Sequence, residues 1–78
     1  MAKKVSNVHS GVLKCDVSYM ERVGLAHHVQ HRIPAGHEVM VRDVEEDGHL
    51  YVEVVDMKPG FTTVVKMPYF DTDWEDLI

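Results

Sequence analysis

The fold is decided by residues 36–70, which read GHEVMVRDVEEDGHLYVEVVDMKPGFTTVVKMPYF. Apolar and polar residues alternate in three runs, 38–44, 49–57 and 61–69. This period of two places one set of side chains on a buried face, and the Asp-Gly and Pro-Gly pairs between the runs suit tight reversals. The stretch predicts an antiparallel meander. The side chains expected to point into the core are Val39, Val41, Leu50, Val52, Val54 and Val65.

The N-terminal half is harder to interpret. We expect residues 1–8 to be flexible, because they are polar and lack a period, and we expect a first strand over residues 13–19. Residues 18–21, Ser-Tyr-Met-Glu, match a capping box that would open a helix, whereas residues 25–33 alternate as a strand does. We predict a loop or a single helical turn over 18–24, followed by a strand.

The C-terminus carries a second capping box, Thr72-Asp73-Trp74-Glu75, followed by Leu77 and Ile78. A short helix there would place Trp74, Leu77 and Ile78 on one side. The whole chain of 78 residues is expected to form one domain. The predicted fold class is mainly β, a single small antiparallel barrel or curved sheet of about five strands with a short C-terminal helix.

The stretch from Ile33 to Val41, Ile-Pro-Ala-Gly-His-Glu-Val-Met-Val, with the hairpins after it, resembles the strand and turn rhythm of SH3-like small barrels. The resemblance covers roughly half of the chain and rests on this pattern, without a functional motif. It implies a binding module rather than an enzyme, and it assigns no site residue.

The charge balance narrows the class of partner. Thirteen acidic residues against eight Lys and Arg give a formal net charge of −5, and the acids concentrate in residues 43–47 and 71–76. Such a chain repels phosphates and anionic lipid, so direct nucleic-acid binding and membrane binding are not expected. The lone Cys15 excludes an intramolecular disulfide, and no apolar stretch approaches the ~20 residues of a membrane span, so we expect a cytoplasmic protein.

Histidines form an unusual cluster, with four of the six lying between His27 and His37. On a helix, His27 and His31 would be ~5–6 Å apart between Cβ atoms and could share a metal ion with His37 or Cys15, whereas on a strand they would be ~13 Å apart. The spacing matches no zinc signature, so no metal site is predicted and a His-rich metal-binding protein stays an alternative. A further alternative is an oligomer that binds an anionic, nucleotide-like molecule through His27, His31, Arg32 and His37.

No catalytic residue or cofactor is predicted. Cys15 alternates with Leu13 and Val17, which is typical of an inert core thiol, and the acids of residues 43–47 fall at a predicted hairpin tip, where carboxylates are usually solvated. The sequence therefore favours a non-enzymatic protein.

The C-terminal segment is the predicted recognition site. Its aromatic side chains offer large contact areas, and its acids would steer docking to a basic protein surface. The predicted partner-binding residues are Tyr69, Phe70, Asp71, Asp73, Trp74, Glu75 and Asp76. The competing interpretation is that the Phe70 and Trp74 rings close one end of the barrel.

Taken together, these features predict a small acidic binding protein that occludes a surface of a partner macromolecule. In its small size and acidity it resembles the small acidic inhibitors that phages make. This resemblance implies that the protein acts in a host cytoplasm on a target in host defence or nucleic-acid processing. Because Tyr51, Val55 and Met57 make the second face of their strand largely apolar, a homo-oligomer is also expected.

Overall fold

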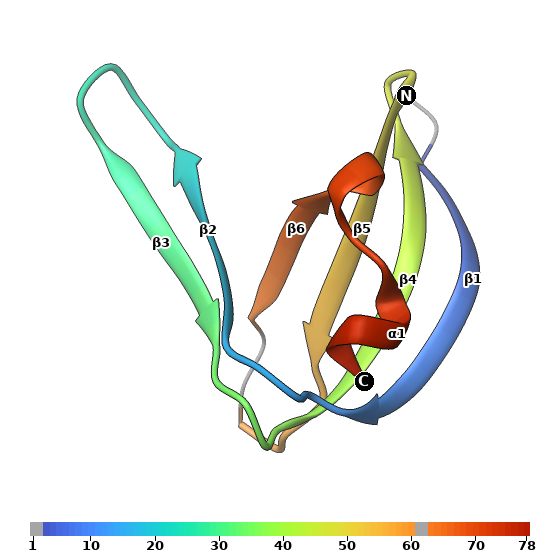
Figure 1. The fold of residues 1–78 in the computed structure, drawn as a ribbon. Coiled ribbons are helices and arrows are strands. Elements are labelled where there is room, and N and C mark those ends of the chain that lie inside the picture. Colours follow the sequence, from blue (N-terminus) through green and yellow to red (C-terminus); the bar gives the residue numbers. More distant parts are fainter. Residues whose placement is uncertain (1–2, 61–62) are drawn as a thin grey trace.

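Two antiparallel sheets make up the protein in a computed structural model that describes residues 3–60 and 63–78. The elements are β1 (Lys3–Val12), β2 (Val17–Arg22), β3 (His28–Ile33), β4 (Glu38–Glu46), β5 (His49–Asp56), β6 (Val64–Pro68), the 3₁₀ helix η1 (Tyr69–Asp71) and the helix α1 (Trp74–Leu77). The larger sheet has the order β1-β4-β5-β6, and β2 and β3 form a separate hairpin (Figure 1). The predicted class is confirmed as mainly β with a short C-terminal helix, and the larger sheet is curved and open rather than a closed barrel.

The predicted meander is confirmed as β4, β5 and β6. Each strand pairs with the next in antiparallel register, with Val41 opposite Val54 and Val54 opposite Val65. The β4–β5 turn uses Asp47 and Gly48, both with positive φ (53° and 79°), as two-residue hairpin turns of the right twist require. The third predicted run began at Phe61, which lies outside the described residues, and β6 begins at Val64.

Gly48→Ala is expected to lower the free energy of unfolding by about 1 kcal/mol, because a Cβ is strained at positive φ although nothing lies within 4 Å of its position. Urea unfolding of both proteins measures the difference. Gly24→Ala is the matched control, since its Cβ would meet only ordinary contacts with His27 at 3.9 Å and its φ lies outside the strained range. Equal stability of the two variants would contradict the turn geometry.

The core lies on one face of the larger sheet, where the predicted inward residues Val39, Val41, Val52, Val54 and Val65 are buried. The hairpin base adds Val17 and Ile33, the β1–β2 connection adds Leu13, and α1 adds Leu77. Both sheets and the C-terminal helix therefore share one core. The prediction for Leu50 is wrong, because this side chain is 43% exposed at the turn end of β5, beyond the buried part of the strand.

The N-terminal predictions are partly wrong. Residues 3–8, expected to be flexible, belong to β1, which pairs with β4 from Lys3 opposite Glu46 to Val12 opposite Glu38. The strand predicted over 13–19 is divided, since residues 13–16 connect β1 to β2. Strand pairing uses backbone groups that any sequence supplies, so an edge strand needs no apolar alternation when it pairs with a strong neighbour.

The helical turn predicted over residues 18–24 is also wrong. Residues from Val17 to Arg22 pair one to one with β3 in reverse order, and the Tyr19 and His31 rings stack across the pair with centroids 4.8 Å apart. The cross-strand partners outweigh the local capping signal. In Figure 1 the β2–β3 hairpin diverges from the larger sheet toward its tip.

A bulge interrupts β1. The register with β4 shifts between Ser6 and His9, and Asn7 has a φ of 50°. The Asn7 side-chain amide donates to Asp43 Oδ2 at 2.8 Å, which holds the irregular backbone against β4. Bulges of this kind bend a strand and increase its twist.

A buried charge network stabilises the other face of the sheet. Glu53 on β5 is 1% exposed, and its Oε1 accepts from Arg42 Nε at 3.0 Å and Nη2 at 2.8 Å, while Lys3 Nζ lies 3.2 Å from Oε2. Burial raises the pKa of the Glu53 carboxyl, but the hydrogen bonds and positive charges of Arg42 and Lys3 outweigh burial and hold the pKa below its ordinary value. The network joins β1, β4 and β5.

Candidate partner-binding surface

The C-terminal segment is fastened to the body at several points. Asp73 caps α1, with its Oδ1 accepting from Glu75 N at 3.1 Å, so the predicted helix is confirmed but its cap is Asp73, one residue after the predicted cap Thr72. Lys14 donates from Nζ to Glu75 O at 3.0 Å and from its backbone N to Leu77 O at 2.7 Å. The segment is therefore held in one conformation although most of its side chains are exposed.

The aromatic side chains of this segment differ in exposure. Phe70 is 89% exposed and meets Tyr69 edge to face, with ring centroids 5.8 Å apart. Trp74 stacks on His9 of β1, with centroids 3.7 Å apart and an interplanar angle of 6°. The interpretation that Phe70 closes an end of the fold is wrong, whereas Trp74 does cover β1 with one face of its ring.

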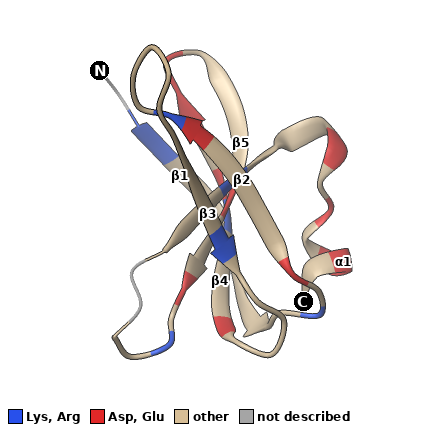
Figure 2. Ribbon diagram, turned by 90° about the vertical axis from the view of Figure 1, so that its left-hand side faces the viewer, with Lys and Arg blue, Asp and Glu red and all other residues tan. Residues whose placement is uncertain are grey.

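Four carboxylates lie in the same segment as these rings. Asp71, Asp73, Glu75 and Asp76 are all exposed, and none forms an ion pair with a cation in residues 3–60 or 63–78. Figure 2 shows acidic positions along this segment and α1. Their negative charge is therefore free to act on an approaching molecule.

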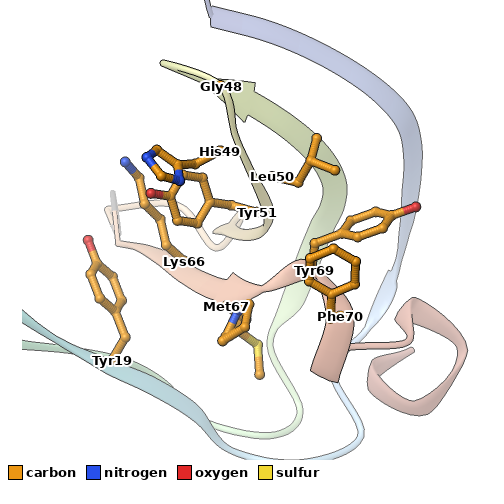
Figure 3. A pocket seen from close by; sticks show the side chains of 10 residues that line it. Tyr19, Gly48, His49, Leu50, Tyr51, Lys66, Met67, Tyr69 and Phe70 are labelled. Carbon is orange, nitrogen blue, oxygen red and sulfur yellow. The ribbon is translucent and has the colours of Figure 1, made fainter.

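A groove of ≈ 530 Å³, here called the aromatic groove, opens on one side of Phe70. It is lined by Tyr19, Gly48, His49, Leu50, Tyr51, Lys66, Met67, Pro68, Tyr69 and Phe70. In Figure 3 the rings of Tyr19 and Tyr51 and the Lys66 side chain come from β2, β5 and β6 and border the same space. Most of its wall is apolar or aromatic, as is usual for binding sites.

The positive charge of Lys66 in the aromatic groove is partly neutralised by a nearby carboxylate. Lys66 Nζ lies 5.5 Å from the centre of the Tyr51 ring and 3.7 Å from Glu46 Oε2. Burial, and then the negative charge of Glu21, raise the pKa of the Tyr19 phenol, which stays protonated as a hydrogen-bond donor. The groove therefore combines donors with a large aromatic surface.

A second hollow of ≈ 570 Å³ lies on the other side of Phe70. It is lined by Asn7, His9, Asp43, Val52, Tyr69, Phe70, Thr72, Asp73 and Trp74. The buried Thr72 hydroxyl has no hydrogen-bond partner in the described part of the chain. Because Tyr69 and Phe70 line both spaces, they form a ridge between the aromatic groove and this more polar, acidic hollow.

The alternative ligand site is not brought together. His27 is exposed near the hairpin tip, His31 stacks on Tyr19 with its Nε2 3.3 Å from Glu21 Oε1, and Arg32 pairs with Asp16. His37 lies at the base, where its Nδ1 is 2.9 Å from Oδ2 of the buried Asp56. Across the described ranges, no three His, Cys, Asp or Glu side chains form a group that could hold a metal ion.

Two further sequence inferences change with the structure. Cys15 is exposed rather than part of the core, because residues 13–16 form a connection in which only Leu13 is buried. The aromatic groove was missed, since Tyr19, Tyr51 and Lys66 lie far apart in sequence. The only available signal was the unusually apolar second face of residues 49–57, which carries Tyr51.

The chain was compared with known proteins. No family model, no curated protein and no solved structure matches it. In the described part of the chain, no helix has the length and hydrophobicity needed to cross a bilayer.

Proposed function

We propose that this chain is a small acidic, non-enzymatic binding protein that occludes a basic surface of a partner macromolecule with residues 69–76. One observation carries the proposal: the Phe70 ring is 89% exposed on a ridge between two hollows and is accompanied by four exposed acids without described ion-pair partners.

The energetics of recognition support this assignment. An aromatic ring that enters a partner's pocket can supply a large share of binding free energy, and acids at the rim increase the rate of encounter with a basic surface. The Asp73 cap, the Lys14 contacts and the buried Leu77 fix the segment in advance. A fixed segment loses less conformational entropy on binding than a mobile one.

The specific form of the proposal is an inhibitor of the phage type that acts in a host cytoplasm on a defence or nucleic-acid-processing system. Its support is the small size and the net charge of −5, together with an acidic surface of the kind that competes for the basic binding sites of such systems. The partner in this form is a protein with a basic surface.

Phe70→Ala is expected to reduce capture of the partner from a bacterial lysate by about tenfold or more, because a hot-spot aromatic contributes about 2 kcal/mol or more. Immobilised wild-type and variant proteins are compared by quantitative mass spectrometry. Asp71→Lys should reduce capture more strongly at low salt than at high salt, because Asp71 is exposed and makes no described ion pair, so the change acts mainly through charge.

Met57→Ala is the matched control, because Met57 is an exposed apolar residue just after β5 ends at Asp56, whereas residues 69–76 follow Pro68, which pairs near the other end of β5. It should capture the same protein as the wild type. A partner that Phe70→Ala and Asp71→Lys both retain in full would overturn the proposal.

A further inference from the structure

The second hollow beside Phe70 is here called the acidic hollow. Its volume of ≈ 570 Å³ is in the range of ligand pockets. Two carboxylates line it, that of Asp43 from β4 and that of Asp73 from the cap of α1. Among the residues that the structure describes, no Lys or Arg lines this space. The acidic hollow therefore favours a positively charged ligand.

Both carboxylates keep an oxygen that can accept further hydrogen bonds. Asp43 Oδ2 accepts from Asn7 Nδ2 at 2.8 Å, and Asp73 Oδ1 accepts from Glu75 N at 3.1 Å. Within residues 3–60 and 63–78, the other oxygen of each carboxylate has no hydrogen bond, and neither carboxylate forms an ion pair. Two acceptors from separate elements are thus available to a cation with several donors.

An unsatisfied hydroxyl belongs to the same wall. Thr72 lines the acidic hollow, and its Oγ1 is buried without a hydrogen-bond partner in the described part of the chain. A buried polar atom without a partner costs free energy and is uncommon in folded proteins. A bound ligand that carries N–H donors would satisfy this oxygen. The observation points to a donor-rich ligand independently of the charge.

Aromatic rings form much of the remaining wall. Tyr69, Phe70 and Trp74 line the acidic hollow, with the Trp74 ring stacked on that of His9. Aromatic faces attract cations, and a planar guanidinium can also stack on them. A guanidinium presents five N–H donors in a fixed fork, whereas an ammonium has three donors and is more strongly hydrated. The combination of carboxylates, hydroxyl and rings favours arginine over lysine.

We propose that the acidic hollow binds the guanidinium group of an arginine on the partner protein. Asp43 and Asp73 accept hydrogen bonds from the guanidinium, and the Thr72 hydroxyl accepts another. The inference rests on the proposed function, since it names the side chain by which residues 69–76 recognise a basic surface. It also adds a residue of β4 to that site, and it places the bound arginine beside the exposed Phe70 ring.

The first test is a titration of the full-length, ¹⁵N-labelled protein with N-acetylarginine amide at neutral pH. Saturable binding is expected, with a dissociation constant on the order of 1 mM. Amide chemical shifts should change most at residues that line the acidic hollow, and the fluorescence of Trp74, the only tryptophan, should change with the same constant. N-acetylcitrulline amide has a similar shape without the charge and should not bind. N-acetyllysine amide should bind roughly threefold more weakly or worse.

Asp43→Asn is expected to raise the dissociation constant of the arginine probe about tenfold, because it removes one of the two charges that face the guanidinium. The new amide oxygen can still accept from Asn7. Asp73→Asn should have a similar effect, since asparagine caps a helix as well as aspartate does. Glu45→Gln is the matched control, because Glu45 is an exposed residue of β4 that does not line the acidic hollow. Its affinity should equal that of the wild type.

Thr72→Val distinguishes ligand binding from a structural role of the hydroxyl. Valine has nearly the same shape as threonine but cannot form the hydrogen bond. The variant should be at least as stable as the wild type in urea unfolding, since the hydroxyl is unsatisfied in the free protein. Its affinity for the arginine probe should nevertheless fall by roughly threefold. Lower stability with unchanged affinity would overturn the role given to Thr72.

The inference is overturned if the arginine probe shows no saturable binding, if the citrulline or lysine probe binds equally well, or if Asp43→Asn binds like Glu45→Gln. It is also overturned if Asp43→Asn captures in full a partner that Phe70→Ala loses, and the proposed function then stands without it. A protein that binds the arginine probe but captures no partner through Phe70 contradicts the proposed function instead. The two failures are therefore distinguishable.

Discussion

Glu53→Ala is expected to lower the free energy of unfolding by about 3 kcal/mol at neutral pH. The change removes a carboxylate that is 1% exposed and leaves Arg42 and Lys3 without their shared partner. Loss of one member of a buried charge network costs far more than loss of a surface ion pair, because the remaining charges are still poorly hydrated. Urea unfolding monitored by Trp74 fluorescence measures the difference.

The same network makes stability depend on pH in a defined direction. The folded state holds the pKa of Glu53 below its ordinary value of 4.5, so the folded protein binds the proton less readily than the unfolded chain does. The stabilisation is fully present above the unfolded pKa and is lost as pH falls through the folded pKa. The stability difference between the wild type and Glu53→Gln should therefore shrink as pH is lowered below about 4.5.

Glu38→Gln is the control for this experiment, because Glu38 is exposed and forms no ion pair with a described residue. Its stability should follow that of the wild type over the whole pH range. A Glu53→Ala protein as stable as Glu38→Gln at neutral pH would show that the network contributes nothing.

Ile33→Ala is expected to lower the free energy of unfolding by about 3 kcal/mol, since it leaves a cavity at a side chain with no exposed surface. Ile33 lies at the base of β3 and packs in the core that the larger sheet shares with the hairpin. The loss should appear in one cooperative transition, seen at the same urea concentration by circular dichroism and by fluorescence.

Val29→Ala provides a comparison on the same strand. Val29 and Ile33 lie on the same face of β3, but Val29 is exposed. Its effect should be less than about 1 kcal/mol. Comparable losses for the two substitutions would mean that the β2–β3 hairpin is packed along its whole length.

The meander was predictable because its signals are local. Alternating valines and an Asp-Gly pair specify strands and their reversal within a few residues, and five of the six predicted inward residues are buried. The exceptions are Leu50, which is exposed, and Val44, which is buried although it was not in the predicted set. Leu50 alternates in phase with Val52 and Val54, but it lies next to the turn, where its side chain is 43% exposed. Which part of a strand face is buried depends on tertiary packing, which alternation does not encode.

The N-terminal half was not predictable for the opposite reason. β1 is a polar edge strand whose sequence shows no regular apolar alternation. It pairs with β4 across more than 20 residues of intervening sequence, so no local signal predicts the pairing. The capping signal at Ser18 is real locally, but pairing with β3 supplies the backbone hydrogen bonds and the Tyr19–His31 contact instead. Non-local pairing thus overrides a weak local preference.

The candidate site was predictable in part. The recognition role predicted for the aromatic and acidic residues of the C-terminal segment stays a prediction, and the 89% exposure of Phe70 contradicts only the competing interpretation of a covering ring. The aromatic groove could not be predicted, since it joins Tyr19 to β5 and β6 through the tertiary arrangement. Predicting it requires knowing where the hairpin packs.

The irregularity at Asn7 has a consequence for strand addition at the edge of the larger sheet. β1 is the outermost strand of its sheet, and an outermost strand with a regular backbone is a template for adding strands from other copies into fibrils. The shifted register and the left-handed Asn7 break that template, and Lys3 and Lys4 place like charges on it. A chain that carries an exposed apolar hairpin can therefore remain dispersed, because its longest open backbone edge is a poor substrate for amyloid-like growth.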